Sequence, residues 1–462
     1  MYLLRELLLA ETIEKIIRMD AFLDDVLSQA SEDDLNIIKL YQSANKSIRN
    51  QLIDTAKIFK QYHEKDINKQ ILEGCLDKCI NSFNRVAVLH NILGYLPNLQ
   101  AKEETYLLIK SLLKEIPSLE PKLEPSIVLS DIYNYEVINI SKRFKEWGIP
   151  MLDEDRVILE LPKIEKENPL MWTILIHEIG HNLDDKYLKI TKETFKNIHF
   201  PANDLKILKK WIKEIVADLI SLRIIGPAYM MSFMFFNLLS GNLESFSNTH
   251  PSPKYRLLLM ESKLKDEFDM EDIKGILELL DERQVLYSRS DEPDEVMPNL
   301  DFLIPELDKL VNKSLQILEG KNLEKYTKNQ YDRSVSLSKS LKANIPINSS
   351  RTLDDNELIR LCESFKLRKL YRPFKKNDDN IYSLLSKFEE KPNVASVIIT
   401  AGWIYKFKNT LPEFINIFFK GDGDFDKNYN NYRKILNRND STLLKSIETA
   451  YIQSLFEVGE KL

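Results

Sequence analysis

The sequence predicts a mainly α-helical protein that contains one small β-sheet. Glycine is scarce, with 12 of 462 residues, whereas the usual share is about 7%. Folds with many tight turns and glycine-rich phosphate loops use glycine heavily, so the composition disfavours both. Apolar residues recur at helical spacing through the first 120 residues, and no proline precedes Pro97. Long helices are therefore permitted there.

Composition divides the chain into three regions. Residues 1–120 form a helical N-terminal region, which ends at a cluster of prolines at 117, 121 and 125. Residues 121–285 contain the chemically informative motifs, and we expect the small sheet at about 126–162. Residues 286–462 form a helical C-terminal region, which opens with an acidic, proline-containing connection over 287–307.

Charge, cysteine content and hydropathy exclude several classes of function. The net charge is −6, so no nucleic-acid partner is expected. Three cysteines favour reduced thiols over a disulfide framework. The first residues carry Arg5 and Glu6, unlike the apolar core of a signal peptide. The longest apolar stretch, 224–239, is shorter than the roughly 18 residues of a membrane span. We expect a buried core helix there, no membrane span and a cytoplasmic protein.

Residues 177–181 read His-Glu-Ile-Gly-His, which is an H-E-x-x-H motif. Residues four apart share one face of a helix, so His177 and His181 can reach the same ion. Glu178 lies one step round the helix, where a base for a metal-bound water should sit. Gly180 costs about 1 kcal/mol relative to alanine in mid-helix, which suggests a close approach of a neighbouring backbone. The alternative is an amphipathic helix with two surface histidines.

A second helix, predicted over residues 211–222, supplies two carboxylates. Glu214 and Asp218 share one face, and the opposite face is apolar. Buried carboxylates are costly unless they meet a cation or a donor. We expect Glu214 to be the third metal ligand and Asp218 to accept the free N–H of a ligand imidazole. The alternative is a helix with two solvated acids.

Together, the motifs HEIGH at 177–181 and EIVAD at 214–218 resemble those of the gluzincin-type zinc metallopeptidases. The likeness covers about residues 126–265. It implies a zincin-like α+β catalytic core, flanked by the helical N- and C-terminal regions. It also implies a bound Zn²⁺ held by His177, His181 and Glu214.

Residues 156–161 alternate like a strand. In the zincin fold, an edge strand of this kind lies above the metal and pairs with the extended backbone of the substrate. The resemblance therefore implies substrate contacts at Val157, Ile158 and Leu159.

Residues 249–256 resemble the T-H-P…R segment of peptidases related to the HtpX and CAAX-processing families. By this resemblance His250 donates to the oxyanion and Arg256 pairs with Asp218, while Tyr255 is the alternative oxyanion donor. Those families span membranes, and this chain lacks their spans, so their substrate classes are not carried over.

The sequence thus predicts a zinc-dependent peptidase that acts on a protein or peptide substrate. Glu178 takes a proton from the metal-activated water and hands it to the leaving amine. Two alternatives stay open. One is a non-catalytic or vestigial zinc-binding scaffold, and the other is a narrow-specificity protease that cuts one partner. The oligomeric state is not assigned.

Overall fold

The structure of the protein is a computed structural model. It describes residues 4–29, 32–61, 71, 74–75, 77–84, 103–114, 125–130, 135–139, 157–238, 243–265, 268, 300–323, 325–342, 395–420 and 424–459.

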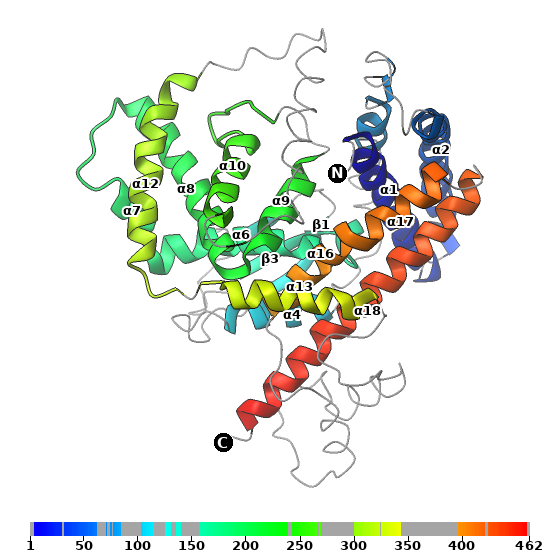
Figure 1. Ribbon diagram of the computed structural model, residues 1–462. Coiled ribbons are helices and arrows are strands. Elements are labelled where there is room, and N and C mark those ends of the chain that lie inside the picture. The colour runs from blue at the N-terminus through cyan, green and yellow to red at the C-terminus, as the bar shows by residue number, and fades with distance from the viewer. Residues whose placement is uncertain are drawn as a thin grey trace.

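Most of the described chain is helical (Figure 1), which confirms the mainly α prediction. The N-terminal helices are α1 (Leu4–Gln29), α2 (Glu32–Gln61) and α4 (Glu103–Lys114). The middle of the chain forms α6 (Ile174–Leu183), α7 (Ile190–Thr194), α8 (Ala202–Ile225), α9 (Pro227–Leu238) and α10 (Pro253–Lys265). The later helices are α12 (Ile304–Glu319), α13 (Lys328–Lys342), α16 (Ala395–Tyr405), α17 (Leu411–Ile415) and α18 (Phe425–Gly459). Short 3₁₀ or π turns are η2 (Lys163–Glu165), η3 (Met171–Thr173), η4 (Asp184–Leu188), η5 (Asp301–Leu303), η7 (Lys406–Thr410) and η8 (Asn416–Lys420).

Three strands, β1 (Pro125–Ser130), β2 (Glu136–Asn139) and β3 (Val157–Pro162), form a small sheet in the order β1-β3-β2. The predicted strand at 156–161 is present as β3, but the expectation that it is an edge strand is wrong. β1 pairs with it in parallel on one side and β2 pairs antiparallel on the other. Because both sides are paired, the backbone of Val157, Ile158 and Leu159 is not free to bind a substrate in the expected manner.

Helix α6 carries the H-E-x-x-H motif and packs against both the sheet and α8. Gly180 of α6 lies directly against the backbone of α8. A Cβ atom at this position would be 3.0 Å from the carbonyl oxygen of Ala217 and 3.2 Å from its Cα. The close approach expected at Gly180 is therefore present, and it brings the two motif helices together.

Helix α8 ends at Gly226, which has a φ of +68°. That backbone conformation favours glycine, and the ring of Tyr326 occupies the space that a side chain at this position would need. The chain then turns into α9, which is buried along most of its length. The stretch 224–239 was expected to be one buried core helix; its described residues are mostly buried and helical, but Gly226 divides them between the end of α8 and α9. Within the described residues, no helix combines the length and apolarity needed to cross a membrane.

The N-terminal helices pack against the C-terminal ones, and α16 lies between them and the middle of the chain (Figure 1). Every residue of α16 is buried. It contacts α13 and α18, α8 and α9 of the middle of the chain, and α4 of the N-terminal region. A single apolar core consequently runs through all three regions of the sequence. The boundaries at 120 and 285 stay a prediction.

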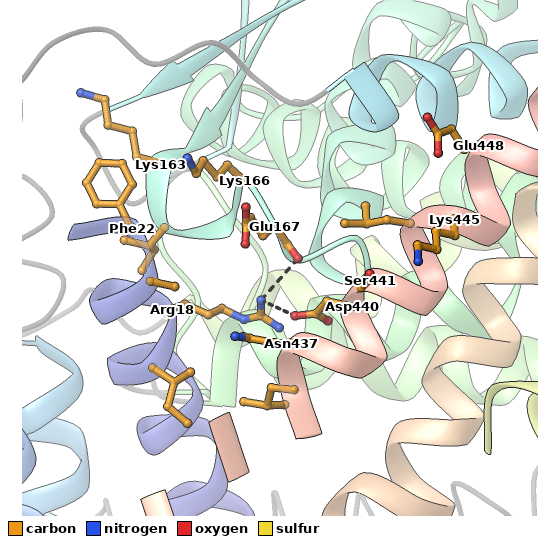
Figure 2. A pocket seen from close by; sticks show the side chains of 15 residues that line it. Arg18, Phe22, Lys163, Lys166, Glu167, Asn437, Asp440, Ser441, Lys445 and Glu448 are labelled. Carbon is orange, nitrogen blue, oxygen red and sulfur yellow. Dashed lines mark hydrogen bonds and ion pairs between the residues drawn. The ribbon is translucent and has the colours of Figure 1, made fainter. Parts of the chain in front are cut away.

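Charged side chains of α1 are buried at this junction, which the sequence did not indicate. Lys15 pairs with Glu165 of η2, Arg18 donates to Asp440 of α18 at 2.9 Å, and Lys406 donates to Glu14 at 2.9 Å. Figure 2 shows Arg18 reaching across a pocket of about 320 Å³ to Asp440 and to the backbone oxygen of Glu167. Buried ion pairs of this kind fix how α1, η2 and α18 fit together.

The described cysteines fit the expectation of reduced thiols. Cys75 and Cys79 are free and buried, and burial raises the pKa of both. Cys362 lies outside the described residues. Buried thiols with raised pKa values are poor nucleophiles, so Cys75 and Cys79 serve packing rather than chemistry.

Candidate metal centre

The three predicted metal ligands meet in space. Nε2 of His177 lies 3.3 Å from Oε2 of Glu214, and Nε2 of His181 lies 3.3 Å from Oε1 of the same carboxylate. One ligand atom from each of the three residues lies within 4.8 Å of the other two. Within the described part of the chain, no other group of His, Cys, Asp or Glu meets this criterion. The four-residue spacing on α6 places the two imidazoles on the same face of the helix. The packing of α6 against α8 brings the Glu214 carboxylate next to them.

Asp218 stands behind His177, as the sequence predicted. Its Oδ1 atom lies 2.9 Å from Nδ1 of His177. Arg256 of α10 donates to both carboxylate oxygens, from Nε to Oδ2 at 2.6 Å and from Nη2 to Oδ1 at 2.7 Å. Asp218 and Arg256 are both buried. A fork of this kind fixes the carboxylate in one orientation.

Tyr229 belongs to the same cluster and was missed in the sequence. Its hydroxyl donates to Oδ1 of Asp218 at 2.5 Å and lies 3.0 Å from Nδ1 of His177. The sequence placed it within an apolar core helix, and its ring is indeed fully buried. The available signal was a phenol in an otherwise apolar stretch just after Gly226-Pro227, since a buried tyrosine hydroxyl usually finds a partner.

Electrostatics keep the carboxylates ionised. Burial would raise the pKa of Asp218, but the charge and hydrogen bonds of Arg256 outweigh it and hold that pKa at about 2. For Glu214, burial is likewise outweighed by hydrogen bonds from His177 and His181, so its pKa lies well below the ordinary range. Burial lowers the pKa of His177, yet hydrogen bonds to Asp218 and Glu214 raise it to about 9 when no metal is bound. The site is therefore arranged to hold positive charge.

The T-H-P segment lies beside the carboxylate of Glu214. Nε2 of His250 is 3.8 Å from Oε1 of Glu214, and the imidazole is 56% exposed. Ser247 shapes the turn by accepting the backbone N–H of His250 at 2.9 Å, and Trp211 of α8 donates to the backbone oxygen of Ser247 at 2.8 Å. Burial lowers the pKa of His250, and the charge of Arg256 lowers it further against the opposing effect of Glu214. The imidazole is thus neutral at pH 7.

Tyr255, the alternative oxyanion donor, points elsewhere. Its hydroxyl donates to Asp308 of α12 at 2.6 Å. Tyr255 is also not among the residues that line the cleft beside His177 and Glu214, whereas His250 is. Between the two alternatives, the structure brings only His250 to the centre.

A cleft of about 320 Å³ is lined by two of the three ligands, His177 and Glu214. Glu178 lines it and is partly exposed. Its lining is mixed, with aromatic and polar side chains. The phenylalanine and tyrosine residues of the lining are Tyr135, Tyr229, Phe233 and Phe236, and its polar residues include Ser245, Ser247 and His250. None of the described residues of β3 lines this cleft; the sheet contributes through Tyr135, which directly precedes β2.

Comparison with known proteins gives no family for this chain. No protein-family model, curated protein or solved structure matches it. The likeness to gluzincins consequently stays a resemblance carried by two short motifs. Function is inferred from the geometry and charge of the site alone.

Proposed function

We propose that His177, His181 and Glu214 hold a Zn²⁺ ion and that the protein is a zinc-dependent peptidase. The single observation that supports this most is the convergence of the three ligand atoms within 4.8 Å of one another. Two imidazoles and one carboxylate are the ligand set of many catalytic zinc sites. Such sites use three protein ligands and leave one position open for water or substrate.

The charge and chemistry of the donor set fit a divalent cation. Glu178, Glu214 and Asp218 with Arg256 carry a net formal charge of −2 when the histidines are neutral. A dication neutralises that charge. Imidazole nitrogen suits zinc better than it suits magnesium or calcium, which prefer oxygen ligands. The Asp218 carboxylate orients His177 from behind, as outer partners of metal-bound histidines commonly do.

When bound, zinc lowers the pKa of a coordinated water and polarises the scissile carbonyl. Glu178 would accept a proton from the attacking water and deliver it to the leaving amine. Its place on the wall of the cleft beside His177 gives it access to both positions. His250 acts as a neutral donor to the developing oxyanion. The Thr249 hydroxyl lies 2.8 Å from Nδ1 of His250, and when that hydroxyl donates, Nε2 of His250 carries the hydrogen and can donate it.

The substrate-binding strand is assigned to β2 instead of β3. Within the described residues, β2 has a partner on one side only, which is β3. Tyr135, which directly precedes β2, lines the cleft, so β2 begins next to the site. An extended peptide that adds to the outer edge of β2 gains backbone hydrogen bonds while its scissile bond reaches the metal.

The test replaces Glu178 with glutamine. Glu178→Gln is expected to abolish hydrolysis of casein and of a peptide library while the purified protein keeps about one zinc per chain. Glu306→Gln, on the exposed side of α12, is the matched control and should retain full activity. Full activity of Glu178→Gln would exclude this mechanism.

The same assay separates the alternative functions. A wild-type protein that binds zinc and cleaves the library but not casein is a narrow-specificity protease. A wild-type protein that binds zinc and cleaves neither substrate is a scaffold in which the centre has a structural role, unless a single cognate protein is cut. Screening candidate partners for cleavage, with Glu178→Gln as the inactive reference, resolves that last case.

A further inference from the structure

We propose that Tyr229 is a positioning residue of the metal centre, whose hydroxyl orients Asp218 and His177 so that Nε2 of His177 faces the ion. This inference rests on the zinc site proposed above, though not on peptidase activity. Nothing in the H-E-x-x-H or E-x-x-A-D motifs points to Tyr229, because it comes from α9, a different helix.

The hydrogens around Asp218 can be assigned one by one. Asp218 is a carboxylate held by the Arg256 guanidinium, so it only accepts hydrogen bonds. Tyr229 has one hydroxyl hydrogen, and it points to Oδ1 of Asp218 at 2.5 Å. It cannot also donate to Nδ1 of His177, which is 3.0 Å away. Nδ1 must therefore carry a hydrogen, directed toward Asp218 and the phenol oxygen.

That assignment decides which nitrogen of His177 is available to a metal. A neutral imidazole carries one hydrogen, and with that hydrogen on Nδ1 the lone pair lies on Nε2. Nε2 is the atom that faces Glu214 at 3.3 Å. The Tyr229 hydroxyl thus acts as a second acceptor for the Nδ1 hydrogen and as a donor that keeps Oδ1 in place. Both effects favour the tautomer that binds metal.

The phenol itself is rigidly placed. Its ring is fully buried and lies parallel to the His177 ring, with an interplanar angle of 4° and 6.1 Å between the ring centroids. It lies three residues after Gly226, at the corner where α8 turns into α9. Tyr326 packs against this corner and donates its backbone N–H to the backbone oxygen of Arg223 at 2.7 Å. The corner that carries Tyr229 is therefore held partly by Tyr326, which is not a metal ligand.

The test is zinc affinity, measured by competition with a chelator of known affinity at fixed pH. Tyr229→Phe keeps the ring and removes only the hydroxyl. We expect it to bind zinc about 10- to 100-fold more weakly than wild type, the range seen when an outer partner of a metal-bound histidine is lost. The visible absorption of the cobalt-substituted protein should change as well, because the His177 ligand is reoriented.

The matched control is Tyr429→Phe. Tyr429 is also fully buried and also donates its hydroxyl to an aspartate, Asp20, but it lies on α18. A purely structural role of such a bond predicts that both variants lose stability and neither loses zinc affinity. We expect Tyr429→Phe to bind zinc as wild type does. Zinc affinity of Tyr229→Phe within about twofold of wild type overturns the inference, as does an equal loss in Tyr429→Phe.

A second variant covers the case in which Tyr229→Phe fails to fold. 4-Aminophenylalanine at position 229 restores a donor on the ring, and we expect zinc affinity within about tenfold of wild type. A folded protein with that residue and a loss above about 100-fold contradicts the inference. If wild type binds no zinc, the proposed metal site itself fails. If wild type binds zinc and cleaves nothing, only the peptidase assignment fails, and the role of Tyr229 is still decided by the affinities.

Discussion

Replacing Gly180 with alanine tests whether the metal centre depends on direct contact between α6 and α8. The new Cβ would lie 3.0 Å from the carbonyl oxygen, 3.2 Å from the Cα and 3.4 Å from the carbonyl carbon of Ala217. All three neighbours are backbone atoms, which cannot rotate away as a side chain can. The helices must therefore separate by a few tenths of an ångström to admit the methyl group.

Two opposing effects set the change in stability. Alanine gains about 1 kcal/mol over glycine inside a helix, and overpacking a tight contact costs about 1–3 kcal/mol. We expect a net loss of up to about 2 kcal/mol in the free energy of unfolding. Glu214 lies on α8 three residues before Ala217, so the same separation moves it from His177 and His181. Metal ligands tolerate deviations of only about 0.2 Å, and zinc affinity should fall by roughly tenfold or more.

The assay combines urea unfolding in chelator with zinc competition in the folded protein. Gly74→Ala is the matched control, because Gly74 is helical and a Cβ there would meet no atom within 4 Å. It should stabilise the protein by up to about 1 kcal/mol and leave zinc affinity unchanged. If Gly180→Ala is stabilised as much as Gly74→Ala and binds zinc as tightly as wild type, the helix contact does not control the site.

Three further outcomes are expected. Arg256→Met leaves the buried Asp218 carboxylate without its guanidinium and should cost about 3–5 kcal/mol in urea unfolding; a loss below about 1 kcal/mol contradicts the buried pair. Burial raises the pKa of Asp440 to about 6, so the folded state binds a proton more tightly than the unfolded state. The free energy of unfolding should therefore fall as pH rises from about 4 to about 6. The fall should be at most about 3 kcal/mol, because the Asp440 side chain is 15% exposed and solvent weakens the effect. Asp440→Asn should flatten this part of the pH profile. Zinc at a free concentration 100 times its Kd should raise the unfolding free energy by about 2.7 kcal/mol, and a melting temperature indifferent to zinc would contradict specific binding to the folded state.

Local spacing explains which parts of the fold and the site were predictable. Two histidines four residues apart on a helix face the same direction, and the same rule applies to Glu214 and Asp218. The scarcity of glycine made Gly180 conspicuous, and Gly180 lies against the backbone of Ala217 in the contact between those two helices. These features follow from helix geometry and from one small residue at a crossing.

The features that were missed depend on contacts between distant segments. β2 is only four residues long. Its pairing makes β3 a central strand, but the sequence of β3 alone does not reveal this pairing. Tyr229 reaches Asp218 because α9 folds back across α6 and α8 after Gly226. The ion pairs of Glu14, Lys15 and Arg18 join α1 to segments about 150 to 420 residues away. Helical periodicity alone does not reveal such partners.

The most direct test of the metal centre is the zinc content of protein purified without chelators, measured by elemental analysis. Wild type should carry about one zinc per chain, and His181→Ala and Glu214→Ala should each carry far less after the same purification. Glu306→Gln should match wild type. Wild-type protein that holds no zinc even after incubation with the metal, or variants that hold as much as wild type, would contradict the assignment of His177, His181 and Glu214 as the metal ligands.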